Sequence, residues 1–296
     1  MSSYPAKVTV LTHANDNFET GPYVLSRVVE SWKKIGIDVR ILRGIGRFEA
    51  ADALILHVNL TIVPDTYLDF CRQYPVVING GVQDISKRKI SSHLVSPQDF
   101  YCGPVIVKTN RNFGGAPERM IAQQRFLHRL ISRVKRRLPW SWTGYLHPQE
   151  YPVFASSRDV PHAVWRNPHL VVEKFLPERE GHYYCLRNWI FFGDREVNRR
   201  VFSTNPIVKA RNTTHHEDGF PVPGELRALR AKLRFDYGKF DYTLVNGETV
   251  LCDANHTPGI RQGILTPRQA FMVEELAQGL FSFFTKNGEQ QETGTP

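Results

Sequence analysis

FDYGKFDYTLVNGETVLCDANHTPG, residues Phe235–Gly259, is the stretch of sequence that decides the fold. Residues 240–245 are rich in β-forming side chains, and Asn246-Gly247 is the strongest short signal for a hairpin turn. Residues 249–254 are therefore expected to return as a second strand. Asp253 and Asn255 lie two positions apart at its end, so a strand points both side chains to one face.

Asp241, on the first strand, shares that face only under one condition. A strict two-residue turn pairs Val245 with Glu248 and sends Asp241 to the other face, whereas a three-residue loop (Val245 with Thr249) or a β-bulge brings it back. Two carboxylates and an amide oxygen would then lie together, with Lys239 two residues ahead of Asp241. Mg²⁺ takes one or two carboxylates and completes its shell with water and phosphate oxygens, so the pattern predicts a magnesium–phosphate site. The alternative is a surface hairpin with three unrelated polar residues.

The composition is that of an ordinary globular protein. The chain has 296 residues, 41% of them hydrophobic and 11% aromatic, which is enough for two or three lobes. A net charge of +9 suits an anionic ligand or partner. The four cysteines follow no CxxC spacing and are typical of a reduced, intracellular protein. Because we find no signal peptide and no apolar run of about 18 residues, we expect a cytoplasmic protein.

The N-terminal part alternates strands and helices. Short β-rich runs occur at 7–12, 37–42, 53–58 and 75–78, and a helical pattern opens at Pro22 and ends at Gly36. This order is typical of a parallel sheet with covered faces, and it predicts an α/β lobe over residues 1–95.

A strand at 105–108 ends in Lys108 and is followed by a polar loop, 109–117, that contains two glycines. Backbone N–H groups of such a loop can cradle phosphate oxygens, although the lysine precedes the glycines, unlike in a Walker A loop. A plain surface loop is the alternative. Residues 118–138 predict a helix with one basic face, which is either solvated or a patch for RNA or an acidic protein.

The remaining chain predicts strands at 170–176, 183–192 and 197–203 and helices at 223–233 and 266–284, before a disordered tail at 286–296. Over roughly residues 84–260 these motifs, in this order, resemble the ATP-grasp superfamily. The resemblance implies an α/β protein with the ATP-grasp fold: an N-terminal parallel α/β lobe (1–95) and an ATP-grasp domain (96–285). That domain would comprise a small nucleotide-clamping lobe, about 104–176, and a catalytic lobe, about 177–285.

The resemblance also implies which residues bind the nucleotide's phosphates. The segment DISKRK matches the region of the first phosphate-binding lysine, for which we favour Lys87 over Lys89. VIVKTNRNFGG matches the second lysine, Lys108, and its flexible loop with Gly114 and Gly115. The loop has fewer glycines than the richest members of the superfamily.

VVEKFLP is similar to the hinge between the lobes that holds adenine. By this resemblance, Glu173 meets the adenine amino group, and Glu180 holds the ribose hydroxyls. The backbone of three residues would pair with the edge of the base: Lys174, Phe175 and Leu176.

GKFD and LCDANHTPG match the strands that carry the family's metal site, which implies Asp241, Asp253 and Asn255 as ligands. The superfamily usually has glutamate at the position of Asp253, and aspartate offers the same oxygens on a side chain one methylene shorter. Lys239 matches a basic residue near the transferred phosphate. Two further residues, Arg187 and Arg211, lie where the glutamate-ligase branch places arginines against the carboxylate and phosphoryl group.

The activity implied is that of an ATP-dependent ligase (EC 6.3-like) that activates a carboxylate as an acylphosphate and transfers it to an amine or other nucleophile. The expected cofactors are ATP and Mg²⁺, with Mn²⁺ as an alternative ion. The expected substrates are a small-molecule or peptide carboxylate and an acceptor of unspecified identity. We expect no membrane or nucleic-acid partner, and a homodimer is compatible with the sequence. Two alternatives remain: a kinase on the same fold, and a non-ligating nucleotide-binding protein that docks an acidic partner.

Overall fold

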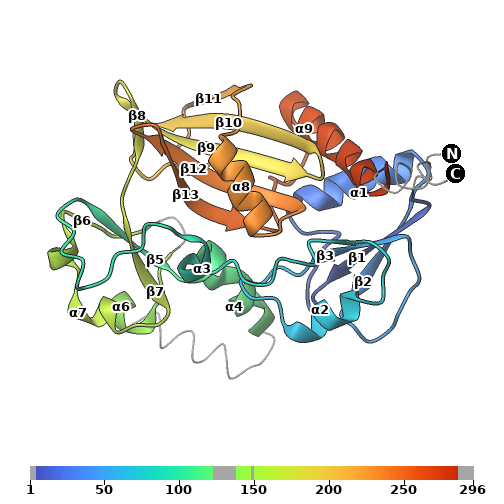
Figure 1. The fold of residues 1–296 in the computed structure, drawn as a ribbon, viewed down its shortest axis with the longest axis horizontal. Coiled ribbons are helices and arrows are strands. Elements are labelled where there is room, and N and C mark those ends of the chain that lie inside the picture. Colours follow the sequence, from blue (N-terminus) through green and yellow to red (C-terminus); the bar gives the residue numbers. More distant parts are fainter. Residues whose placement is uncertain (1–4, 123–137, 148–149, 286–296) are drawn as a thin grey trace, which may run out of the picture.

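The computed structural model describes residues 5–122, 138–147 and 150–285, which form three β-sheets (Figure 1). The α/β fold class expected from the sequence is confirmed. Most of the basic helix predicted over 118–138 and the whole tail at 286–296 lie outside the described residues. Within those residues, none of the helices has the length and apolar character needed to cross a bilayer.

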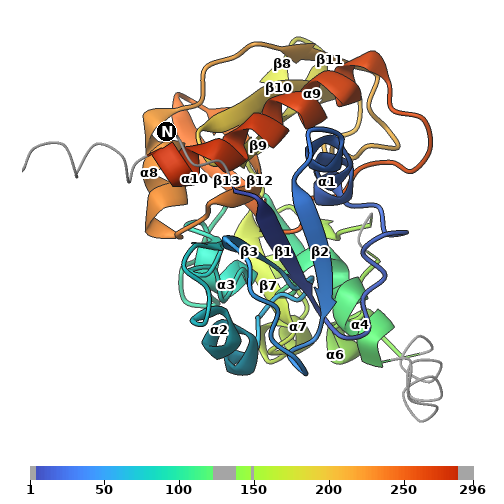
Figure 2. The same ribbon diagram turned by 90° about the vertical axis from the view of Figure 1, so that its right-hand side faces the viewer.

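The N-terminal sheet is parallel, with the strand order β2-β1-β3-β4. Its strands are β1 (Lys7–Thr12), β2 (Asp38–Arg43), β3 (Ala53–His57) and β4 (Val77–Ile78). Helix α1 (Val24–Lys34) packs on one face through its buried apolar stripe, and α2 (Asp65–Cys71) packs on the other (Figure 2). The predicted strands and helix of this lobe are therefore present, with the fourth strand shorter than expected.

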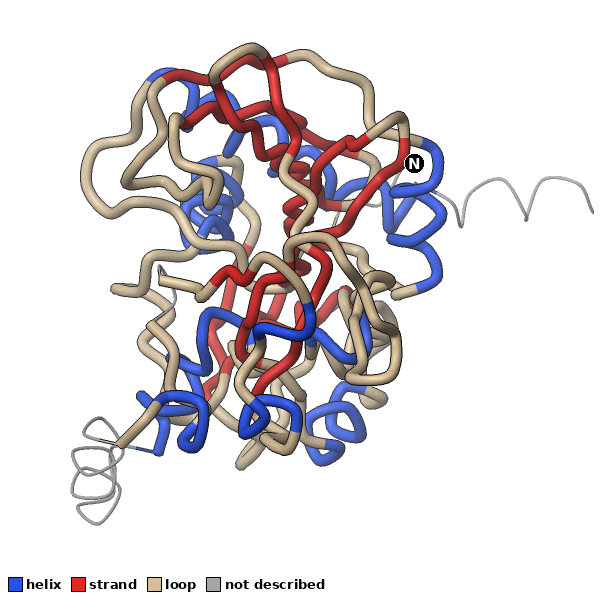
Figure 3. Tube along the Cα trace, turned by 90° about the vertical axis from the view of Figure 1, so that its left-hand side faces the viewer, coloured by secondary structure: helices blue, strands red, loops and turns tan. Residues whose placement is uncertain are grey.

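A small antiparallel sheet comes next, with the strand order β6-β5-β7. Its strands are β5 (Val105–Thr109), β6 (Val153–Phe154) and β7 (Leu170–Lys174). Three short helical segments border it: α6 (Trp140–Thr143), η2 (Ser157–Asp159) and α7 (His162–Trp165). Figure 1 and Figure 3 show these strands below those of the large sheet, and residues of both sheets line one cavity.

The large C-terminal sheet has the strand order β11-β10-β9-β12-β13, and β8 also pairs with β9. Its strands are β8 (Glu178–Glu180), β9 (Tyr183–Phe192), β10 (Arg195–Ser203), β11 (His215–Asp218), β12 (Tyr237–Val245) and β13 (Glu248–Asn255). Helix α8 (Gly224–Lys232) covers one face, and α9 (Pro267–Gln278) covers part of the other beside α1. The helix predicted over 266–284 is divided into α9, η3 (Gly279–Phe281) and α10 (Ser282–Thr285).

One continuous core ties the N-terminal lobe to the large sheet. Trp32 of α1 is fully buried and donates its indole N–H to the Ala277 carbonyl of α9 at 2.8 Å. Apolar side chains of α1, α9, β9 and β12 form a single buried cluster around this contact. The segment between β4 and β5 contains α3 (Lys87–Ile90), and β5 is followed by η1 (Asn112–Gly115) and α4 (Ala116–Ala122).

Gly279, at the end of α9, provides a test of this core. Its backbone is helical, but a Cβ there would overlap the Phe192 carbonyl oxygen of β9. We expect Gly279→Ala to lower the free energy of unfolding by about 1–3 kcal/mol through overpacking, as measured by urea denaturation. Gly224→Ala is the matched control, because nothing lies within 4 Å of its Cβ position. Equal stability of the two variants would contradict the close packing of α9 on β9.

Candidate functional site

The β12–β13 hairpin closes with a strict two-residue turn. Val245 pairs with Glu248, and Asn246 and Gly247 both have positive φ, 52° and 83°. The three-residue loop considered from the sequence is therefore absent. This turn alone would send Asp241 to the opposite face from Asp253.

A β-bulge at Cys252 corrects the register. Tyr242 pairs with Leu251, yet the next pair is Asp241 with Asp253, so one residue of β13 is left without a cross-strand partner. Beyond the bulge, Lys239 lies opposite Asn255. The condition on which the sequence interpretation depended is thus met by the bulge and not by the turn.

Each of the two opposed carboxylates has a lysine partner. Lys239 Nζ lies 2.8 Å from Asp241 Oδ2, and Asn188 of β9 donates to the other oxygen of Asp241. Asp253 forms an ion pair with Lys87 of α3. Burial would raise the pKa of Asp253, but the charge of Lys87 and its neighbours lowers that pKa below its ordinary value. Asp253 is therefore held as a carboxylate.

Lys87 and Lys89 have different surroundings. Lys87 is 5% exposed and reaches from α3 to the hairpin, whereas Lys89 is exposed. The structure therefore brings Lys87 to the cluster, as favoured from the sequence.

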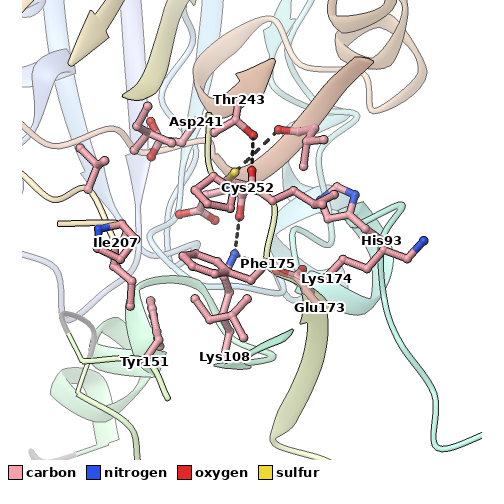
Figure 4. A pocket seen from close by; sticks show the side chains of 18 of the residues that line it. His93, Lys108, Tyr151, Glu173, Lys174, Phe175, Ile207, Asp241, Thr243 and Cys252 are labelled. Carbon is pink, nitrogen blue, oxygen red and sulfur yellow. Dashed lines mark hydrogen bonds and ion pairs between the residues drawn. The ribbon is translucent and has the colours of Figure 1, made fainter. Parts of the chain in front are cut away.

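Lys108 and Glu173 form a second charged pair, on the small sheet. In the β5–β7 register they occupy diagonal positions on one face, and Lys108 Nζ lies 2.7 Å from Glu173 Oε2. Lys108 also donates to the Cys252 carbonyl at 3.3 Å, which ties the small sheet to the bulge (Figure 4). Burial acts to lower the pKa of Lys108, but the charge of Glu173 raises it overall, so the pair stays ionised.

A cavity with about 800 Å³ of empty space, part of it open to solvent, lies between the two sheets. Figure 4 shows Asp241 and Thr243 of β12 on one side of it and Lys108 and Tyr151 on the other. Eight of the residues predicted from the sequence line this cavity: Lys87, Lys108, Glu173, Lys174, Phe175, Leu176, Asp241 and Asp253. Of these, Lys174 has an exposed side chain, whose Nζ lies 5.2 Å from the centre of the Tyr101 ring.

Arg187 lies on the opposite face of the large sheet. It pairs with Tyr242, next to the Asp241–Asn188 pair, so strand alternation points it toward α8 and away from the carboxylates. There it forms a two-pronged ion pair with Glu178, at 2.7–3.2 Å. Arg187 therefore lies outside the cavity lining, and its role against the carboxylate and phosphoryl group stays a prediction.

Lys239 and three further predicted side chains also lie outside the cavity lining. Glu180 is exposed and paired with Arg200, and Arg211 is exposed in the loop after β10. Asn255 accepts hydrogen bonds from the backbone and hydroxyl of Thr257 at 2.8 and 3.2 Å, so its oxygen is directed at that residue.

Gly114 and Gly115 belong to a loop with unusual backbone geometry. Phe113, Gly114 and Gly115 all have positive φ, and the Phe113 side chain is 60% exposed. The loop is anchored from the N-terminal lobe, because the Asn112 N–H donates to Thr61 Oγ1 at 2.9 Å. Neither glycine lines the cavity.

Sequence reasoning missed Asn188 and Lys209. Lys209 lines the cavity, with its Nζ 4.7 Å from the centre of the Tyr151 ring, and burial lowers the pKa of its ammonium group. Asn212 organises its loop by accepting from the Lys209 N–H and donating to the Ile207 carbonyl. The only local signal was a lysine in a polar loop, which is too common to single out.

The donor set fits a hard divalent cation. Asp241 and Asp253 are directly opposed, face a cavity rich in lysine, and offer the carboxylate oxygens that Mg²⁺ prefers. Within the described part of the chain, no group of three or more His, Cys, Asp or Glu side chains is arranged to hold a metal. A Mg²⁺ ion would therefore need its other ligands from an amide, water or a bound phosphate.

Comparison with solved structures identifies the fold. The VanG D-Ala:D-Ser ligase from Enterococcus faecalis superposes with a TM-score of 0.51 at 10% identity, over 95% of this chain and 100% of that chain. Two further solved structures are also similar. The D-alanine–D-alanine ligase from Bacillus anthracis complexed with ATP has a TM-score of 0.47 at 14% identity, over 97% of this chain and 98% of that chain. A RimK domain ATP-grasp protein from Sphaerobacter thermophilus has a TM-score of 0.46 at 11% identity, over 94% of this chain and 99% of that chain. No family profile and no curated protein sequence matches this chain.

The chain therefore shares the fold of the VanG ligase, which confirms the expected fold and no more than the fold. The identities are too low to transfer a substrate or a residue's role from any of these proteins.

The Lys108–Glu173 pair gives a test of the site's electrostatics. Glu173 is 1% exposed, so Glu173→Gln would leave Lys108 buried without its counter-charge and should cost about 3–5 kcal/mol in urea denaturation. Glu30→Gln, which breaks an exposed pair with Arg27, should cost less than about 1 kcal/mol.

The pH dependence supplies a second measurement on the same variants. Burial acts to raise the pKa of Glu173, but Lys108 lowers it overall, so the folded protein binds this proton less readily than the unfolded chain. The ion pair should contribute fully to the free energy of unfolding above pH 4.5, the ordinary pKa of a glutamate, and this contribution should be lost as the pH falls below that value. Glu173→Gln should flatten that part of the stability curve; an unchanged slope would contradict the ion pair.

Proposed function

We propose that this protein is an ATP-dependent ligase that activates a carboxylate as an acylphosphate and passes it to a nucleophile. The observation that supports this most directly is the opposed pair of Asp241 and Asp253 over an inter-sheet cavity in which each carboxylate is neutralised by a lysine. Such a cluster suits a triphosphate tail, whose transfer chemistry consists mainly of positioning and charge neutralisation.

In this proposal the nucleotide base lies along the hinge formed by the end of β7. The backbone of Lys174–Leu176 lines the cavity and would pair with the edge of the base, while Glu173 keeps Lys108 oriented. Lys87, Lys108 and Lys209 would then exchange part of their present interactions for phosphate oxygens. Glu180 and Arg211, outside the cavity, would approach the ribose and the reacting group only if their segments move on binding.

Asp241 and Asp253 would hold Mg²⁺, with Asn255 as a third ligand after its oxygen turns from Thr257. When bound there, Mg²⁺ would neutralise charge on the phosphate oxygens. Lys239, beside Asp241, would stabilise the negative charge of the phosphoryl group during transfer.

The reaction has two balanced steps. A carboxylate oxygen of the substrate attacks the γ-phosphorus, and the bond to the β–γ bridging oxygen breaks to release ADP. The nucleophile then attacks the acyl carbon and loses a proton, and inorganic phosphate departs. The acylphosphate must be shielded from water between these steps, and the Thr109–Pro117 loop is our candidate for this role.

The test combines nucleotide binding with trapping of the intermediate. The protein is incubated with Mg-ATP, a panel of carboxylic acids and hydroxylamine, which converts an acylphosphate to a hydroxamate with release of phosphate. We expect equimolar ADP and hydroxamate with at least one acid. Asp253→Asn should lower the rate of both by a factor of about 100 or more, whereas the exposed Asp194→Asn should not change it.

The outcomes separate the candidate classes. ADP release without hydroxamate would identify a kinase, because a phosphate ester does not react with hydroxylamine. Binding of ATP with no turnover on any acid would identify a nucleotide-binding protein. Full activity in Asp253→Asn would remove the basis of the proposal.

A further inference from the structure

Arg199, on β10, is a charged residue that the site described so far does not use. Within the described part of the chain its guanidinium forms no ion pair, and its buried Nε has no hydrogen-bond partner. A half-buried guanidinium without an acceptor is costly, since an unmade hydrogen bond forfeits the solvation that the group had in water. The Arg199 guanidinium therefore needs an acceptor, which is either an anion bound from solution or a group of the protein itself.

Strand pairing puts Arg199 in the same cross-strand row as the carboxylates. Arg199 pairs with Asn188, Asn188 with Asp241, and Asp241 with Asp253. All four side chains thus leave one face of the sheet, in the order of the strands β10, β9, β12 and β13. Arg199 is two strands from Asp241, which is roughly 10 Å between backbones. An extended arginine side chain spans much of that distance.

The nearby anions are already occupied. Asp241 is bound by Lys239 and Asn188, and Asp218, opposite Arg199 on β11, is paired with Arg268 at 2.7 Å. Asp253 and Glu173 have their own lysines. The pKa of Arg199 is lowered by burial, an effect that the charges of Asp241 and Asp218 only partly oppose. Its positive charge is therefore not balanced locally.

The two ends of this cross-strand row have different surroundings. Its Asp253 end adjoins Lys87 and the nucleotide cavity, whereas Arg199 does not line that cavity. In the proposed function the nucleotide's phosphates occupy the Asp253 end of the row. On that arrangement the Arg199 end of the row is left for the group that receives the phosphoryl.

We propose that Arg199 binds the anionic end of the acid substrate, the carboxylate before transfer and the phosphoryl group of the acylphosphate after it. This inference rests on the proposed function and adds a residue to it. The guanidinium fork matches the paired oxygens of either group and, in this role, gains the acceptors that it lacks in the protein alone.

The experiment uses the full chain saturated with ADP and Mg²⁺, with inorganic phosphate and acetate as separate probes, and measures binding by titration calorimetry. We expect Arg199→Gln to weaken phosphate, acetate or both at least tenfold while ADP affinity changes less than twofold. Arg199→Lys should recover part of the loss. Arg195→Gln, an exposed arginine on the same strand, is the matched control and should leave all three affinities unchanged.

The probe that responds tells which anion Arg199 holds. Unchanged phosphate and acetate affinities in Arg199→Gln would overturn the inference, as would an equal loss of ADP affinity or binding of neither anion by the wild-type complex. Thermal melts check folding; if Arg199→Gln melts far below the wild type while Arg199→Lys folds and binds both anions normally, the role is structural and the inference fails. If the wild-type protein does not bind ADP, the proposed function itself fails.

Discussion

The whole candidate site depends on one extra residue in β13. A two-residue turn and an unbroken ladder would place Asp241 opposite Cys252 and turn Asp253 into the core on the α8 side. The bulge at Cys252 shifts the ladder by one position and puts both carboxylates on the cavity side. It also exposes the Cys252 carbonyl to Lys108 of the small sheet. A single backbone irregularity therefore aligns the acids and links the two sheets.

Electrostatic pairing then holds three parts of the chain around that bulge. Lys87 comes from the segment after the N-terminal lobe, Lys108 from the small sheet and Lys239 from the large sheet, and each has a carboxylate partner. Such pairs gain little net stability when buried, because desolvation offsets most of the attraction. In the proposed function their value is that two of the lysines, Lys87 and Lys108, already line the cavity that phosphate oxygens would enter.

Sequence reasoning found the parts of this site that are local and missed those that depend on tertiary contacts. The sequence predicts the hairpin, its two aspartates and the lysine of β5, because turn residues and strand ends are recognisable in the sequence there. The sequence did not predict which face of the sheet Arg187 lies on. The residues that follow it, Trp189–Phe192, are buried on both faces and show no alternation. The same lack of alternation hid Asn188, its neighbour. Lys209 reaches the cavity through a loop held by Asn212, which no periodicity reveals.

The face of the large sheet that carries the acids also carries the main core, and this division explains how the fold tolerates so much charge. Ile190, Phe192 and Tyr237 pack against α1 and α9 at one end of β9 and β12, in the cluster that contains Trp32. At the other end the same strands present Asn188 and Asp241 on this face, and Asp241 lines the cavity. Burial of one half of each strand fixes the position of the strand, and the hydrogen bonds between strands keep the other half in place. The polar half can therefore keep closely spaced charges without having to stabilise the sheet itself.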